Sequence, residues 1–220
     1  MASVCRIMVV FIKNLPRLLF CIAFLVLLAG CATTLKVKDT TRTFHTVVID
    51  PGHGGKDSGA SKRGVQEKNA ALDVALRLDS KLRDAGFNTV LTRKGDYFVE
   101  LNERAAISNR QTNAIFISVH FNDSSKRRIN GVETYYNSQV SAGLASRICA
   151  SLASLTPSRG IHQANFRVLR LNTYPAVLVE CGFLSNGHEA NHAKSAVYRQ
   201  KLADQIARAI IEARRSGAPQ

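Results

Sequence analysis

The chain of 220 residues carries 30 Lys and Arg against 16 Asp and Glu, which gives a formal net charge of +14, and 45% of its residues are hydrophobic. This composition excludes a disordered or fibrous chain and is sufficient for one hydrophobic core of ordinary size. The positive charge favours an anionic partner such as nucleic acid, an acidic lipid surface or an acidic polymer.

Residues 1–30 have the organisation of a bacterial lipoprotein signal peptide. Arg6, Lys13 and Arg17 give a basic start without an acidic residue, and residues 18–29 form an apolar stretch of 12 residues. This stretch is shorter than the roughly 20 residues of a membrane-spanning helix, so a cleaved secretory signal is favoured over an uncleaved anchor. The tetrad LAGC at 28–31 resembles a lipobox, which implies cleavage before Cys31 and acylation of that cysteine.

Acylation of Cys31 would hold the mature chain on a membrane. By resemblance to lipoprotein sorting, Ala32 favours the outer membrane of a two-membrane cell, facing the periplasm, and the polar residues 31–43 predict a tether. Export and the lack of interleaved aromatic residues argue against nucleic acid. Membrane phosphates, carboxylates of cell-wall peptides and a merely solubilising basic surface remain. Outside the signal and the lipobox, Cys149 and Cys181 remain free thiols, and the sequence leaves their pairing open.

Residues 44–215 alternate short runs rich in β-branched residues with longer stretches of helical periodicity, and residues 216–220 form a tail. Strands are predicted at residues 46–50, 88–92, 114–119, 131–136, 166–169 and 176–180. Helices are predicted at residues 69–85, 102–111, 140–155 and, as one or two helices, 188–215. This order predicts a single α/β domain with a mainly parallel or mixed twisted sheet and helices on both faces.

Three reactive side chains lie at or just after carboxyl ends of predicted strands, where ligands collect in open α/β sheets. His53 follows the first strand in the glycine-rich turn DPGHGG, His120 follows the third strand, and Glu180 ends the last. With Glu67, which precedes the first helix, the two histidines form the ligand set of a catalytic zinc that keeps one position open for water. Glu180 is then the candidate general base. Taken singly, each residue could also have a purely structural role. Glu67, for example, could stabilise the amino terminus of a helix, where a negative charge is favourable.

Four separated motifs resemble the zinc-dependent N-acetylmuramoyl-L-alanine amidases of cell separation and spore lysis. They are DPGHGGKDSGA at 50–60, the surroundings of Glu67, SVHFN at 118–122 and PAVLVECGFLSN at 175–186. The resemblance runs in order over residues 46–214. It implies Zn²⁺ bound by His53, Glu67 and His120, with Glu180 catalytic. It also implies hydrolysis of the amide between the lactyl group of N-acetylmuramic acid and L-alanine in peptidoglycan, for wall remodelling or daughter-cell separation.

Six further residues are candidates for supporting the metal ligands or the substrate: Asp50, Asp57, Arg93, Arg104, Asn122 and Asn186. For the two arginines, structural ion pairs are favoured over contacts with substrate carboxylates. The 59 residues between His120 and Glu180 are filled by predicted elements, so a helix that plugs the site is not expected. No self-contained wall-binding module is predicted, and a monomer is expected.

Two alternatives stay open at the level of sequence. Residues 188–192, HEANH, match the H-E-x-x-H motif of zinc peptidases, and Glu212 lies downstream as a third ligand. Polar neighbours predict a solvated first helical turn there, which disfavours a buried active helix. The second alternative is a peptidoglycan-binding lipoprotein without catalysis, although such a protein would not need to retain all four site residues.

Overall fold

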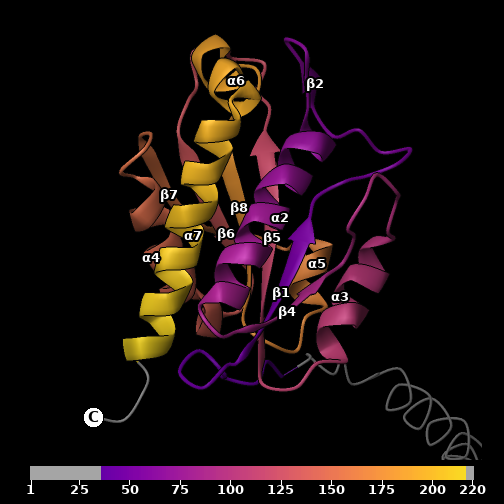
Figure 1. Cartoon of the computed structure of the whole chain (residues 1–220), viewed down its shortest axis with the longest axis vertical. Coiled ribbons are helices and arrows are strands. Elements are labelled where there is room, and N and C mark those ends of the chain that lie inside the picture. The colour runs from indigo at the N-terminus through magenta and orange to yellow at the C-terminus, as the bar shows by residue number, and fades with distance from the viewer. Residues whose placement is uncertain (1–35, 217–220) are drawn as a thin grey trace, which may run out of the picture. The chain divides into compact units, whose positions relative to one another are not determined.

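A six-stranded mixed sheet forms the centre of the domain in the computed structural model, which describes residues 36–216 (Figure 1). In spatial order its strands are β4 (Asn88–Leu91), β1 (Thr46–Pro51), β5 (Ala114–Asn122), β8 (Ala176–Phe183), β6 (Val132–Tyr136) and β7 (Ser158–Gln163). The first four strands are parallel to one another. Strands β6 and β7 are parallel to each other and run against the rest.

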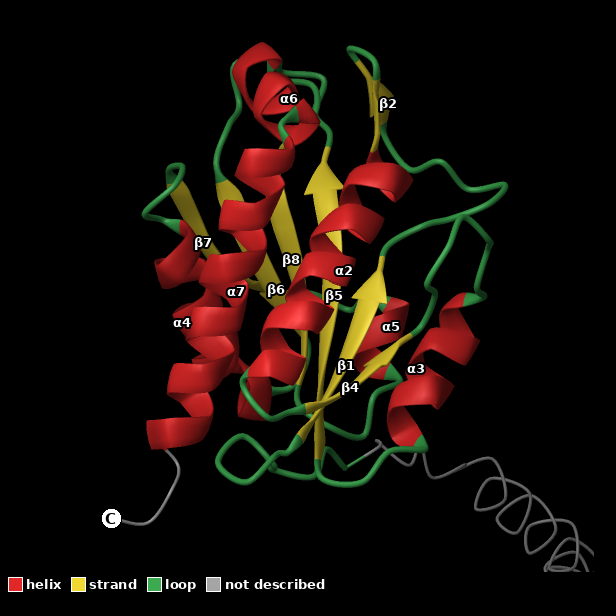
Figure 2. Ribbon diagram, in the orientation of Figure 1, coloured by secondary structure: helices red, strands yellow, loops and turns green. Residues whose placement is uncertain are grey.

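Helices cover both faces of this sheet, as predicted (Figure 2). One face carries α2 (Glu67–Asp84), α4 (Ala142–Leu152) and α7 (Ala196–Ser216), and α7 packs against both of the others. The opposite face carries α3 (Leu101–Asn109) and the single turn α5 (Arg167–Arg170). Beyond the carboxyl ends of the parallel strands lie α6 (Gly187–Lys194) and the hairpin formed by β2 (Ser61–Lys62) and β3 (Val65–Gln66).

The core has two sides because successive side chains of a strand point to opposite faces of the sheet. Ile49, Ile117 and Val179 belong to the cluster beneath α2, α4 and α7, whereas Val48 and Phe116 belong to the smaller cluster beneath α3 and α5. All five are completely buried. Burial of each such side chain contributes roughly 1.5–3 kcal/mol, so the apolar runs that predict the strands also hold the sheet together.

The structure differs from the prediction in two segments, one of which was predicted wrongly and one of which was missed. The strand predicted at residues 166–169 is wrong, because Arg167–Arg170 forms α5 and buries Val168 and Leu169 against the sheet. A four-residue segment with three apolar residues fits one helical turn as well as a short strand. Strand β7 was not predicted, since its side chains are exposed or half-buried and give no apolar alternation. Such weak patterning is common in edge strands.

The chain preceding β1 lies against the end of the sheet where the parallel strands begin. The backbone N–H of Lys38 donates to the carbonyl of Thr173 over 2.8 Å, and the Thr40 hydroxyl donates to the carbonyl of Ala114 over 2.5 Å. Part of the predicted tether, residues 36–43, therefore contacts the domain. The predicted signal peptide, the lipidation site Cys31 and residues 217–220 lie outside the described residues. Between residues 36 and 216, no helix is long and apolar enough to cross a membrane.

Candidate metal centre

The loop that follows β1 places His53 beside the ends of the parallel strands. His53 has a left-handed backbone conformation, with φ of 59°. Its Nδ1 lies 2.8 Å from a carboxylate oxygen of Asp57, and its Nε2 lies 3.0 Å from Glu67. Burial lowers the pKa of His53, but the carboxylates of Glu67 and Asp57 outweigh burial and raise it. A carboxylate on one ring nitrogen fixes the ring and leaves the other nitrogen for a metal.

Glu67 begins α2 and is only 4% exposed. Its Oε1 lies 2.9 Å from Nδ1 of His120 and accepts the backbone N–H of Phe121 over 3.1 Å. Its Oε2 accepts the backbone N–H of Ala60 over 2.9 Å. Burial alone would raise the pKa of Glu67, but hydrogen bonds to His120 and His53 hold that pKa well below its usual range. Glu67 is therefore a charged carboxylate between two imidazoles.

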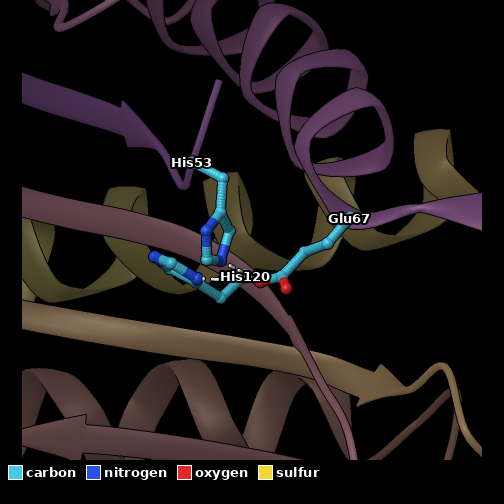
Figure 3. Close-up of side chains that lie close together, drawn as sticks. All are labelled: His53, Glu67 and His120. Carbon is cyan, nitrogen blue, oxygen red and sulfur yellow. Dashed lines mark hydrogen bonds and ion pairs between the residues drawn. The ribbon is translucent and has the colours of Figure 1, made fainter. Parts of the chain in front are cut away.

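His53, Glu67 and His120 come from three separate segments and point toward one another (Figure 3). One ligand atom from each side chain lies within 4.8 Å of the other two. The two imidazole rings meet edge to face with centroids 4.9 Å apart. Over residues 36–216 this is the group of His, Cys, Asp and Glu side chains that brings three ligand atoms so close together. Two nitrogens and one carboxylate oxygen are a donor set that suits Zn²⁺.

Two glycines allow the backbone to approach these three side chains. A β-carbon on Gly52 would lie 2.3 Å from the imidazole of His120. A β-carbon on Gly59 would lie 2.5 Å from the carboxylate of Glu67 and 2.6 Å from the ring of His53. Any residue larger than glycine would displace a predicted ligand at either position. The backbone at Gly52 and Gly59 is therefore shaped to hold the three candidate metal ligands, in agreement with the donor atoms that they offer.

Glu180 lies next to His120 across the sheet, where the two are register partners in β8 and β5. Its Oε2 is buried and has no hydrogen-bond partner among the described residues. Burial raises the pKa of Glu180 well above its usual range, and the nearby carboxylates of Glu67 and Glu133 raise it further. An unpartnered carboxyl oxygen beside three candidate metal ligands is suited to exchanging a proton with a bound reactant.

Glu133 is a neighbour of this site that the sequence reading missed. It is the register partner of Glu180 in β6 and is 6% exposed. Its carboxylate accepts hydrogen bonds from Asn122 over 2.9 Å, from the Tyr135 hydroxyl over 2.8 Å and from Arg159 over 2.7 Å. The available signal was an acidic residue between Val132 and Thr134 in an apolar strand, where an unpaired carboxylate is costly to bury.

Asp50, Arg93 and Arg104 hold the His53 loop through hydrogen bonds and are not among the three candidate ligands. Asp50 accepts hydrogen bonds from Arg104 over 2.9 Å, from Thr92 over 2.6 Å and from Ser118 over 2.7 Å. Arg104 also donates to the backbone carbonyl of His53 over 2.6 Å.

Arg93 donates to the carbonyls of Pro51 over 3.0 Å and Gly52 over 2.7 Å. Both arginines are at most 2% exposed and bind the loop through its carbonyl groups. Asp57 differs from them, because its carboxylate contacts the ring of His53 directly.

The remaining predicted residues have local partners. Asn122 donates to Glu133, and Asn186 caps α6 by accepting the backbone N–H groups of His188 and Glu189. Cys149 and Cys181, whose pairing was left open, are both free and buried. No separate plug helix lies between β5 and β8 in the described part of the chain, since that interval holds β6, β7, α4, α5 and one 3-10 turn (Gln139–Ser141).

The H-E-x-x-H segment forms the first turns of α6, away from the group that includes His53. The rings of His188 and His192 contact each other in a tilted arrangement, with centroids 4.1 Å apart. Glu189 instead points inward and accepts the backbone N–H of Gly131 over 2.9 Å and of Phe183 over 2.7 Å. Its carboxylate is committed to holding two loops, so it is not free to act as the base of a peptidase.

A pocket of about 200 Å³ opens beside the two histidines. Its lining combines the polar residues Asp50, His53, Asp57, Arg104 and His120 with Arg167 and the apolar residues Phe98, Leu101, Phe166, Val168 and Leu178. Leu101 and Phe166 are 47% and 41% exposed. The two candidate histidine ligands therefore line a groove that also has exposed apolar side chains.

The chain is similar to known proteins over this whole region. Residues 47–212 match the family model described as N-acetylmuramoyl-L-alanine amidase. The chain is 38% identical over 167 residues to the N-acetylmuramoyl-L-alanine amidase LytC of Bacillus subtilis, which covers 73% of this chain but 34% of LytC. It is 36% identical over 164 residues to the sporulation-specific N-acetylmuramoyl-L-alanine amidase of the same organism, covering 71% of this chain and 63% of that relative. The chain thus spans only part of these two relatives.

Solved structures show the same likeness. The catalytic domain of CwlV, an N-acetylmuramoyl-L-alanine amidase from Bacillus (Paenibacillus) polymyxa, superposes with a TM-score of 0.74 at 38% identity and covers 77% of this chain and 97% of that domain. The N-acetylmuramoyl-L-alanine amidase AmiC2 of Nostoc punctiforme superposes with a TM-score of 0.73 at 38% identity, covering 76% of this chain and 95% of AmiC2. The family match over residues 47–212 includes every segment that carries the candidate ligands.

Proposed function

The chain belongs to the N-acetylmuramoyl-L-alanine amidase family, and from that membership we propose that it hydrolyses peptidoglycan by zinc-dependent amide cleavage. The bond is the amide between the lactyl group of N-acetylmuramic acid and the L-alanine of the stem peptide. One observation carries the zinc dependence. Ligand atoms of His53, Glu67 and His120 lie within 4.8 Å of one another, beside the unpartnered oxygen of Glu180.

His53, Glu67 and His120 would hold the zinc ion, and Asp57 would fix the His53 ring through Nδ1. When bound, a zinc ion supplies Lewis acidity, which lowers the pKa of a water molecule toward about 7 and polarises a carbonyl group. The carboxylates of Glu67 and Asp57 offset part of the ionic charge. The side chains thereby keep the nitrogen and oxygen donors in place before substrate arrives, which is the condition for a catalytic site that does not reorganise.

Glu180 is the proposed general base and acid. It takes a proton from the water molecule that attacks the carbonyl carbon, and it returns that proton to the alanine nitrogen as the C–N bond breaks. One water molecule is consumed, and the products are the lactyl carboxylate and a free α-amine on the stem peptide. The place of Glu180 next to His120 in the sheet supports this role, because the strand holds its carboxyl group close to the candidate metal ligands.

We further propose that the protein is exported and held on a membrane through Cys31, with the outer membrane and the periplasm as its location. The basic and apolar pattern of residues 1–31 supports this placement. A role in wall remodelling or cell separation, and action as a monomer, complete the proposal. Relatives named as cell wall amidases, such as LytH of Staphylococcus epidermidis at 34% identity, support action on the wall.

Mass spectrometry of products from purified peptidoglycan tests the proposed reaction. Amide cleavage releases intact stem peptides whose first residue is alanine with a free amine, and it leaves glycan strands with free lactyl carboxylates. Glu180→Gln should lower turnover by at least about a thousand-fold, because proton transfer is lost while the metal ligands stay in place. His188→Ala is the control, and it should keep nearly full activity. Cleavage within the peptide, or loss of activity only in His188→Ala, would select the peptidase alternative.

The non-catalytic alternative has its own readout. If the protein cosediments with peptidoglycan, contains zinc and releases no stem peptide, then binding without hydrolysis describes it better. Dialysis against a chelator, with the residual zinc measured by elemental analysis, completes the test. The proposal expects activity to disappear with the metal and to return when Zn²⁺ is restored.

A further inference from the structure

A second hollow, of about 450 Å³, lies at the same end of the domain as the candidate metal centre. It is lined by three basic side chains, one acidic side chain and three serines: Lys62, Arg63, Arg127, Asp123, Ser124, Ser125 and Ser185. We call this group the basic pocket. Nothing in the chemistry assigned to the metal centre uses it.

The basic pocket is built by the segments that carry the metal-centre residues. Arg63, on the β2–β3 hairpin, is four residues before Glu67, and Asp123 is three residues after His120. Ser185 is five residues after Glu180. A fully extended chain spans about 3.3–3.6 Å per residue, so the Cα atoms of Arg63, Asp123 and Ser185 each lie within about 18 Å of the Cα atom of a metal-centre residue. That distance is the reach of a short peptide.

Two guanidinium groups in the pocket have no acceptor. Lys62 lies 3.4 Å from the carboxylate of Asp123 and is thereby partly neutralised. Neither Arg63 nor Arg127 donates a side-chain hydrogen bond to any described residue, and both are exposed to solvent. The pocket therefore has a net positive charge and two guanidinium groups whose N–H donors are free. A guanidinium group can bind a carboxylate through two parallel hydrogen bonds.

Both arginines lie beside the turn that begins α6. The side chain of Asn186 donates to the backbone carbonyl of Arg127 over 3.1 Å. The Arg63 guanidinium lies beside Gly187, where an added β-carbon would be 3.5 Å from its central carbon. Two loops far apart in the sequence thus present their cations at one place. This placement also gives Asn186, which the sequence reading singled out without a contact, a role in shaping the pocket.

We propose that the basic pocket binds free carboxylates of the stem peptide and thereby sets the direction in which the substrate crosses the metal centre. The inference rests on the proposed function. Charge complementarity carries it, because the stem peptide contains free carboxylates whereas the N-acetylated sugars of the glycan strand are neutral. The glycan then occupies the groove on the other side, whose wall includes Phe98, Leu101 and Phe166. The reacting amide lies between the two.

Soluble muramoyl tripeptides test the direction of binding. One substrate carries free stem carboxylates, and a second is identical except that those carboxylates are amidated. In the double variant Arg63→Glu and Arg127→Glu, KM for the free substrate should rise at least about ten-fold, because each lost hydrogen bond to a charged group weakens binding by that order. Its kcat should change little, and the amidated substrate should lose no affinity. The double variant Arg214→Glu and Arg215→Glu is the matched control, with the same change in charge at the end of α7, far from the hairpin (Figure 1).

The inference is overturned if the double variant at Arg63 and Arg127 and the control variant at Arg214 and Arg215 have equal KM values, or if the free and amidated substrates lose affinity equally. Calorimetric titration with the released stem tripeptide supplies a readout that does not need turnover. If the wild type binds the tripeptide through both arginines but cleaves nothing, the proposed function fails and the anion site stands. Binding of a glycerol phosphate polymer at the pocket, without any binding of the tripeptide, would assign the site to another anion and overturn the inference.

Discussion

The buried ion pair between Arg104 and Asp50 should be worth far more to folding than any surface pair. We consider Arg104→Met, which keeps an apolar side chain of similar length and removes the guanidinium. Arg104 is 2% exposed and Asp50 is 1% exposed. The change leaves Asp50 charged and buried with only the hydroxyls of Thr92 and Ser118 as donors. Breaking a buried pair by removing one partner costs about 3–5 kcal/mol.

The expected loss can be stated as a melting temperature. For a domain of this size each kcal/mol shifts Tm by about 2–4 °C, so Arg104→Met should melt about 6–20 °C below the wild type. The control is Arg83→Met, which removes the same group from its pair with Asp79 on the surface of α2. Exposed pairs of this spacing contribute about 0.3–0.5 kcal/mol, so the control should melt within about 2 °C of the wild type.

Thermal unfolding followed by circular dichroism measures both values in one buffer. The double variant Asp50→Asn with Arg104→Met should recover part of the loss, because no buried charge remains unpaired. The reasoning is refuted if Arg104→Met and Arg83→Met lower Tm by the same small amount. It is also refuted if removing the Asp50 charge makes the Arg104→Met protein less stable still.

Three other predictions concern different parts of the domain. Gly52→Ala should lower zinc affinity at least about ten-fold in an equilibrium dialysis assay, since its β-carbon meets an imidazole ligand, whereas Gly143→Ala in α4 meets nothing within 4 Å and should leave affinity unchanged. Burial raises the pKa of Asp73, but hydrogen bonds from two arginines, including Arg199 of α7, outweigh it and lower that pKa. A depressed carboxyl pKa stabilises the fold above the unfolded value of about 3.9 and loses this effect as pH falls, so Asp73→Asn should lower Tm at pH 7 and converge with the wild type near pH 2. His188→Ala should keep zinc content at one ion per chain by elemental analysis, and loss of that ion would contradict the assignment of the metal centre.

The sequence predicts the sheet well where strands are buried on both faces. The strands that end near His53, His120 and Glu180 are runs of β-branched residues, and their burial is complete or nearly so. The segments that escaped prediction have short or one-sided contacts. β7 lies at the edge of the sheet, and α5 is a single turn of four residues, too short for helical periodicity to show in the sequence.

The candidate site divides in the same way. Histidines and glutamates at the ends of apolar strands carry a signal because a polar group there needs a reason. The acceptors of Arg93 and Arg104 could not be predicted in this way. They are backbone carbonyl groups of a distant loop, and every residue type has a backbone carbonyl. Glu133 was missed for a related reason. Its burial beside Glu180 depends on the antiparallel register of β6, and register is a property of the assembled sheet.

X-ray diffraction at the zinc absorption edge, from crystals of the zinc-loaded protein, tests the central claim most directly. The account predicts one anomalous peak, within bonding distance of His53, Glu67 and His120, with the carboxyl group of Glu180 facing it. A peak bound by His188 and His192 instead, or a zinc-loaded active enzyme with no density among the three predicted ligands, would contradict it.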